Sequence, residues 1–153
     1  MANKRRDIDI INLIKAGYKV ENGDNNEIYV NLLGPKDSLY YGKKWSIVIE
    51  FSNDYPYKSP SIGFVTKIYH PNVDFNSGSI CLDVLNQEWT PIYNLVTIFE
   101  TLLPQLLLYP NPDDPFNIEA ASLMKNNINE YNTVVQLYID KYGLDITNQT
   151  KII

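Results

Sequence analysis

The sequence predicts an α+β fold with an N-terminal helix, a four-stranded antiparallel meander, a long irregular segment and C-terminal helices. Apolar residues have helical spacing near the N-terminus and again beyond residue 94, whereas runs between residues 18 and 65 alternate apolar and polar side chains. Turn-forming residues separate these runs closely, and short connections favour antiparallel strands because parallel strands need long crossovers. No repeat or second domain pattern appears, so we expect one domain over residues 1–153.

The first half of the chain gives a separate signal for each element. Isoleucine and leucine residues between positions 10 and 14 have helical spacing, and Gly17 follows them as a helix C-cap. A strand can form over residues 18–20, and the stretch 22–26, rich in Asn and Gly, is a turn. Short runs bounded by turn formers predict the other three strands, over residues 27–33, 45–51 and 61–65.

Helices return after the irregular segment. An apolar stripe covers residues 95–106, and two shorter patterns predict helices over residues 118–126 and 131–142. Pro104 lies inside the first stripe, where it removes the hydrogen bond to the Glu100 carbonyl. We therefore expect that helix to kink or end there.

Composition and charge narrow the classes of function. The formal net charge of −5 argues against nucleic acid or an anionic membrane as a partner. No apolar run approaches the roughly 18 residues of a membrane span, and the N-terminus lacks an apolar signal core. A single cysteine cannot form an internal disulfide, which fits a reducing compartment. We expect a soluble protein of the cytoplasm, the nucleus or both.

The irregular segment 66–88 contains the chain's one histidine and its one cysteine. A stretch of this length without regular structure usually has a function. Cys81 is the candidate nucleophile, although its apolar neighbours equally fit an inert buried thiol. His70 is either a base or a structural hydrogen-bonding group, and Asn72 either donates to an oxyanion or closes a turn. One His and one Cys supply at most half of a structural zinc shell, so we expect no metal.

An ordered set of motifs around this segment resembles the signature of ubiquitin-conjugating enzymes. A His-Pro-Asn triplet begins at His70, Cys81 stands eleven residues after that histidine, and Trp89 stands eight residues after the cysteine. Further matching runs are Gly34-Pro35, Tyr40-Tyr41-Gly42, residues 55–60 and residues 111–115. The resemblance spans roughly residues 10–142, and the ordered set is more specific than any one motif.

The resemblance implies a division of labour among five residues. Cys81 would accept ubiquitin from the activating enzyme as a thioester, which a substrate lysine or a ligase cysteine would then attack. Asn72 would steady the oxyanion or hold the loop beside it, and Asp114 would orient the incoming lysine. His70 and Pro71 would be structural at the active site. The chain would need no cofactor, since the activating enzyme uses the ATP upstream.

The resemblance also implies surfaces for partners. Tyr57, Pro91 and Ile92 match the two loops that RING-type ligases grip. The first helix is the usual site for the activating enzyme and the ligase, and Arg5 and Arg6 at its start would speed encounter with an acidic partner. The expected partners are therefore ubiquitin, the activating enzyme, a RING-type ligase and protein substrates with lysines.

Two features depart from the commonest family pattern. One extra residue stands between Pro91 and Asn111, the stretch that contains Pro104, so we expect a distorted helix where donor ubiquitin would be supported. Motifs such as residues 59–64 and 103–107 resemble the branch associated with histone ubiquitination in vitro and with a multi-subunit ligase of the glucose-induced-degradation type. The long acidic tail that often ends that branch is not part of this sequence, so we do not expect a tail-dependent preference.

Two alternatives remain at this point. The chain could conjugate a ubiquitin-like modifier in place of ubiquitin, because the motifs do not name the modifier. It could also be a variant of the fold that binds ubiquitin without catalysis. The cysteine at position 81 argues against the second alternative, since loss of that residue would be its sign.

Overall fold

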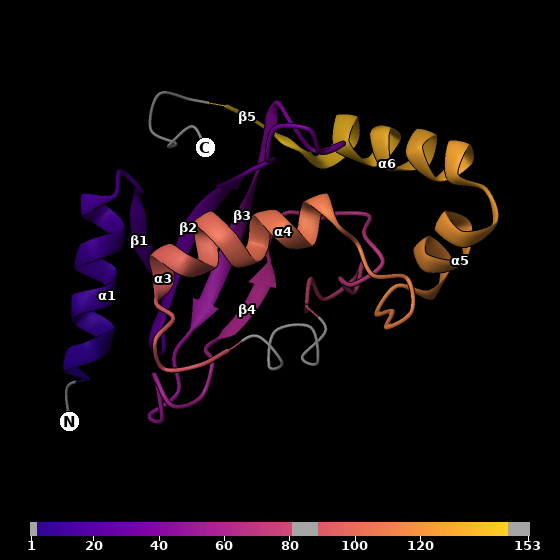
Figure 1. The fold of residues 1–153 in the computed structure, drawn as a ribbon. Helices are drawn as coiled ribbons and strands as arrows, with labels where there is room; N and C mark the ends of the chain where they lie inside the picture. Colours follow the sequence, from indigo (N-terminus) through magenta and orange to yellow (C-terminus); the bar gives the residue numbers. More distant parts are fainter. Residues whose placement is uncertain (1–2, 81–88, 147–153) are drawn as a thin grey trace.

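An antiparallel sheet forms the centre of the computed structural model, which describes residues 3–80 and 89–146 (Figure 1). Neighbouring strands follow the order β1-β2-β3-β4, and the predicted meander is therefore confirmed. The strands are β1 (Val20–Asn22), β2 (Glu27–Leu33), β3 (Lys43–Glu50), β4 (Ser61–Phe64) and β5 (Leu144–Asp145). Strand β5 was not predicted, because two residues are too short to show an alternating pattern. It pairs with the start of β3, where Lys43 forms an ion pair with Asp145 at 2.8 Å.

Alternation along the strands separates a core face from an outer face. In β2, Ile28, Val30 and Leu32 are buried, and they lie opposite Ile49, Ile47 and Trp45 of β3. The residues between them are only half-buried. A shift of one residue would turn these side chains to the wrong face, so their burial fixes the register.

Helix α1 (Lys4–Lys15) begins earlier than the apolar pattern alone required. The side chain of Asn3 accepts a hydrogen bond from the Arg6 backbone N–H at 3.0 Å and caps the helix. Leu13 is fully buried, and Gly17 follows the end of the helix with a φ of 103°. Helix α1 lies at one end of the sheet (Figure 1).

The predicted helix over residues 95–106 is distorted, as expected, but it does not end at Pro104. It consists of α3 (Leu95–Thr97), a π-helical turn η1 (Ile98–Leu102) and α4 (Leu103–Leu108). In the π-helical turn the Leu103 N–H bonds to the Ile98 carbonyl, five residues back. A π turn accommodates one extra residue, and Pro104 follows it in the first turn of α4, where its missing N–H is tolerated.

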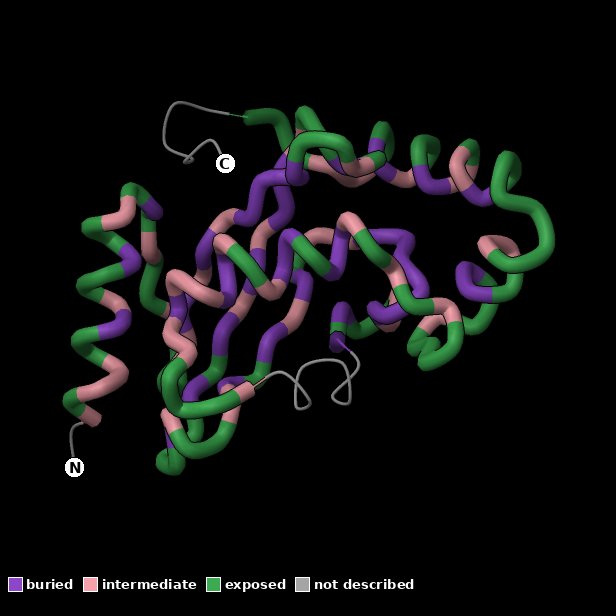
Figure 2. Tube along the Cα trace, viewed as in Figure 1, coloured by how far each residue is buried: buried purple, intermediate pink, exposed green. Residues whose placement is uncertain are grey.

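This distorted helix covers one face of the sheet. It crosses in front of the strands in Figure 1, and Figure 2 shows buried positions both on the strands and on the helix. Leu95, Phe99 and Leu103 are fully buried there, on the same side as Trp45 of β3. Large apolar side chains from both layers therefore form the core.

Two helices complete the described fold. Helix α5 (Ile118–Asn126) has the predicted bounds, and α6 (Ile128–Tyr142) begins three residues before the predicted start. The side chains of Asn117 and Asn127 cap these helices, which accounts for the earlier start of α6. Within the described residues, no helix is both long enough and apolar enough to span a bilayer.

Candidate active site

The irregular segment is ordered by a tight turn up to its last described residue. The Asp74 carboxylate accepts hydrogen bonds from the Ser77 N–H at 2.8 Å and the Ser77 hydroxyl at 2.7 Å, and these bonds lower its pKa. Gly78 follows with a φ of 77°, and a Cβ there would lie 1.9 Å from the Phe64 carbonyl oxygen. Only glycine fits this position.

This turn brings together two residues of the segment that lie seven positions apart, Val73 and Ile80. Ile80 forms an isolated antiparallel bridge with Val73, the residue that follows Asn72. Ile80 is buried, and Cys81 is the next residue along the chain. Cys81, the predicted nucleophile, lies outside the described residues.

His70 is buried with both ring nitrogens in use. Its Nδ1 accepts a hydrogen bond from the Asn72 backbone N–H at 2.9 Å, and its Nε2 lies 2.8 Å from the Leu106 carbonyl oxygen, which can only accept. These partners assign the neutral tautomer with the proton on Nε2. Burial lowers the pKa of His70 to about 4, so the ring is neutral at physiological pH. It connects the irregular segment to α4, and no nitrogen is left to act as a base.

Asn72 joins the irregular segment to the loop before α5. Its Nδ2 donates to the carbonyl oxygens of Asn111 at 2.7 Å and Asp114 at 3.0 Å, and its Oδ1 accepts from the Asn111 N–H at 2.8 Å. Both amide protons are therefore committed to backbone carbonyls, and the residue is fully buried. Of the two roles left open by the sequence, this geometry supplies the contacts for holding the loop. Donation to an oxyanion would require one of the two bonds to open.

Pro71 adds a third connection from the same triplet. Its carbonyl oxygen accepts hydrogen bonds from the backbone N–H groups of Phe116 at 2.8 Å and Asn117 at 3.0 Å. The residues of the His-Pro-Asn triplet therefore hold α4, the loop 111–114 and the start of α5 in one arrangement. Asp114 has its carbonyl fixed in this way while its side chain is exposed. The neighbouring Asp113 forms an ion pair with Lys125 at 2.8 Å.

Tyrosines behind the triplet support it, and sequence reasoning missed their role. The Tyr40 hydroxyl donates to the Tyr69 carbonyl at 2.9 Å, and the Tyr69 hydroxyl donates to Glu119 at 3.2 Å. The ring of Tyr69 stacks on Tyr138 of α6, with centroids 5.0 Å apart. Tyr40 and Tyr69 belong to the matching motifs, but no local pattern could have paired them across 29 residues.

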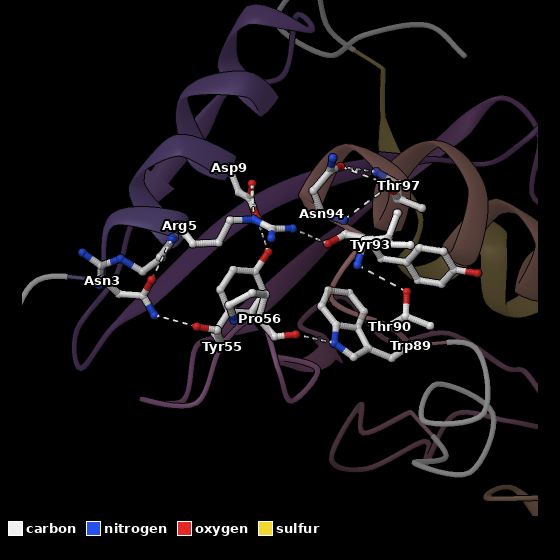
Figure 3. Close-up of polar contacts among 12 residues, drawn as sticks. Asn3, Arg5, Asp9, Tyr55, Pro56, Trp89, Thr90, Tyr93, Asn94 and Thr97 are labelled. Atoms are coloured by element: carbon white, nitrogen blue, oxygen red, sulfur yellow. Dashed lines mark hydrogen bonds and ion pairs between the residues drawn. The ribbon is translucent and has the colours of Figure 1, made fainter.

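The predicted ligase surface consists of two exposed loops. Tyr57 is 80% exposed and Ile92 is 85% exposed, and Pro91 beside it is also exposed. The Trp89 indole N–H donates to the Pro56 carbonyl at 2.9 Å and connects the two loops (Figure 3). These apolar side chains therefore stand on a supported surface, which favours their availability to a partner.

Arg5, predicted as a ligase contact, also forms bonds within the chain (Figure 3). Its guanidinium bonds to the buried Asp9 at 3.0 Å and to the Tyr93 carbonyl at 2.7 Å. The Tyr55 hydroxyl also donates to Asp9, and burial, followed by this bond, raises the pKa of Tyr55. The buried carboxylate needs a cationic partner, and Arg5 satisfies that need. Arg6 pairs with the exposed Asp7 at 3.0 Å and remains partly exposed.

The fold and the motif geometry define the ubiquitin-conjugating class. The family model described as "Ubiquitin-conjugating enzyme" matches residues 6–139, and the chain belongs to this family. Its members are thioester-forming transferases that take ubiquitin from an activating enzyme and act with a ligase.

Named relatives agree with this assignment. Over 143 residues, the chain is 56% identical to "Ubiquitin-conjugating enzyme E2 5" of Arabidopsis thaliana, covering 92% of this chain and 77% of that protein. It is 46% identical over 145 residues to "Ubiquitin-conjugating enzyme E2-24 kDa" of Saccharomyces cerevisiae, covering 93% of this chain and 66% of the relative. The crystal structure of a putative ubiquitin conjugating enzyme from Plasmodium yoelii superposes with a TM-score of 0.83 at 29% identity, covering 95% of this chain and 99% of that one.

The titration of His70 can be followed directly because the chain has one histidine. We expect NMR of the imidazole nitrogens to give a pKa of about 4 and a proton on Nε2 at pH 7. The unfolded chain binds a proton on this histidine near pH 6.5. The contribution of the neutral ring to the free energy of unfolding is therefore complete above that pH. As the pH falls to 4, about 3 kcal/mol is lost. A titration near pH 6.5 in the folded protein would contradict the buried neutral ring.

Replacement of Asn72 separates loop holding from oxyanion stabilisation. Asn72→Ala removes three hydrogen bonds to the loop 111–114. We expect a loss of about 2–3 kcal/mol in unfolding free energy and faster hydrogen exchange of the Asn111 amide, together with normal loading and slow discharge to free lysine. Slow discharge with unchanged stability and exchange would show instead that Asn72 acts on the oxyanion.

Proposed function

We propose that Cys81 carries ubiquitin as a thioester and passes it to a substrate lysine. The observation that supports this most is the His-Pro-Asn triplet, which fixes the loop of Asp114 and stands next to Val73, the partner of Ile80. Cys81 follows Ile80 directly in the sequence. The only cysteine is therefore adjacent along the chain to a segment held rigidly in the described structure.

The chemistry consists of two acyl transfers. In the first, the Cys81 thiolate attacks the thioester between ubiquitin and the activating enzyme, a new C–S bond forms, the old C–S bond breaks, and the thiolate of the activating enzyme leaves. In the second, a neutral lysine amine attacks the new thioester, an amide bond forms, and the Cys81 thiolate leaves. Neither step changes oxidation state, and we propose that the chain needs no cofactor because the activating enzyme consumes the ATP. An incoming thioester is already reactive, so a strongly lowered thiol pKa is not required.

We assign roles around this centre from the contacts described above. The carboxylate of Asp114 accepts a hydrogen bond from the incoming lysine ammonium or amine and eases the loss of the lysine proton. The exposed position of the Asp114 side chain permits this contact. Asn72 positions Asp114 through its bond to the Asp114 carbonyl. His70 and Pro71 fix the frame on which both depend.

We further propose a RING-type ligase as the partner at Tyr57, Pro91 and Ile92. Exposed apolar side chains on supported loops suit a small interface with a few dominant contacts. Arg5 and Arg6 remain part of the proposed surface, because their side chains stay 31% and 30% exposed beside their ion pairs with Asp9 and Asp7. We place the enzyme in the cytoplasm, the nucleus or both, and treat residues 1–153 as one domain.

A charging assay tests the role of Cys81. With activating enzyme, ATP and ubiquitin, we expect a ubiquitin adduct on a non-reducing gel that a thiol reductant removes. Cys81→Ser should form an oxyester more slowly and resist the reductant, because an ester exchanges with thiols far less readily than a thioester. Cys81→Ala should form no adduct. An adduct in Cys81→Ala, or none in the native protein, would refute the assignment.

Discharge to free lysine tests Asp114. Asp114→Asn should load normally and discharge about 100-fold more slowly, with the larger effect at lower pH, where the neutral amine is scarce. The matched control is Asp113→Asn, since the neighbouring carboxylate is paired with Lys125 and should not affect the rate. An equal loss in both variants, or an effect independent of pH, would count against proton handling by Asp114.

A further inference from the structure

A groove of about 360 Å³ lies between α5 and α6, and of its lining residues only Glu119 has been described above. Its lining residues come from α5 and α6: Glu119, Ser122, Leu123, Asn126, Glu130 and Val134. The α5 members are three and four residues apart, so they share one helix face. Leu123 and Val134 pack against the core and form an apolar floor, with carboxylates on both helices.

Among the described residues, neither carboxylate of the groove is paired with a cation. Glu119 accepts from the Tyr69 hydroxyl at 3.2 Å and Glu130 accepts from the Asn127 amide at 3.3 Å, and both donors are neutral. Lys125 is the only basic residue of α5, and it pairs with Asp113 at 2.8 Å. None of the lining residues is basic in the part of the chain that the structure describes.

Two hydrogen-bonded contacts connect the helix that carries Glu119 to the frame that holds Asp114. Tyr69, whose hydroxyl bonds to Glu119, directly precedes His70, and the N-cap of α5, Asn117, bonds to the Pro71 carbonyl. Glu119 stands five residues after Asp114, so the two Cα atoms are at most about 18 Å apart, a span that about five or six residues of an extended substrate can cover.

We propose that this groove binds an arginine or lysine side chain of the substrate, so that the enzyme prefers acceptor lysines in basic segments. The aliphatic stem of such a side chain fits on Leu123 and Val134 while its charged end reaches Glu119 and Glu130. A neutral or acidic segment gains nothing from the carboxylates. The inference rests on the acceptor route proposed above, because it places the groove beside the lysine that attacks the thioester.

Discharge to two peptides of equal length tests the groove. Each peptide has one lysine, flanked by arginines in one case and by glutamines in the other, and free lysine serves as a third acceptor for the ubiquitin-charged chain. We expect the arginine peptide to react about two- to fivefold faster for each carboxylate engaged, and the advantage to shrink at high salt. Glu130→Gln should reduce this ratio and leave discharge to free lysine unchanged. Glu130→Lys should abolish the preference, because one carboxylate and one ammonium then remain in the groove.

Asp140→Asn is the matched control, because it makes the same chemical change on α6 outside the groove lining. It should keep the native preference. Equal rates for both peptides with normal discharge to free lysine would overturn the groove proposal alone, whereas absence of discharge to any acceptor would overturn the proposed function. A preference that survives in Glu130→Gln and Glu130→Lys would also overturn the groove proposal. Self-association through the groove, detected by light scattering, would overturn it as well. Thermal unfolding of each variant confirms that it is folded.

Discussion

The neutral imidazole of His70 is the constraint on which the rest of the site depends. The buried ring accepts a hydrogen bond from the Asn72 N–H and donates one to the Leu106 carbonyl, so it cannot rotate. The irregular segment and α4 therefore keep one relative position. Pro71 and Asn72 then use that fixed backbone to hold the loop 111–114 and the start of α5. Three consecutive residues thereby organise elements that are up to 46 positions away in sequence. A charged ring would lose its acceptor nitrogen and with it the bond to Asn72.

The π-helical turn shows how an added residue is absorbed without loss of this frame. Ile98 and Phe99 before Leu103, and Leu106 and Leu107 after it, are all buried, so the wide turn keeps both halves of the helix facing the core. The Leu106 carbonyl that reaches His70 belongs to the second half. The energetic cost of a rare helical turn is offset by apolar burial on both of its sides. The distortion and the buried histidine are therefore parts of one arrangement.

Periodicity predicted most of the fold because strands β2 to β4 and helix α5 each bury one regular face. It could not predict β5, which has two residues, or the π turn, since Pro104 alone does not show whether a helix kinks, ends or widens. At the site, the motif spacing identified His70, Asn72 and Asp114, but not what they bond to. The contacts of His70 with Leu106 and of Arg5 with Tyr93 depend on tertiary packing, and no local sequence pattern encodes them. The bonds of Arg5 to Asp9 and Tyr93 were not predicted for that reason, because an N-terminal cation is usually solvated.

The burial of His70 also removes the only imidazole from the enzyme's exterior. Histidine is the side chain whose ordinary titration falls between pH 5 and 8. The outer surface therefore has no imidazole to change charge over this interval, and attraction or repulsion toward large acidic or basic proteins stays nearly constant there. A change in turnover with acidity near neutrality therefore cannot come from an imidazole on this chain's surface, which leaves the thiol, the attacking amine, the α-amino group and the partner proteins as its sources.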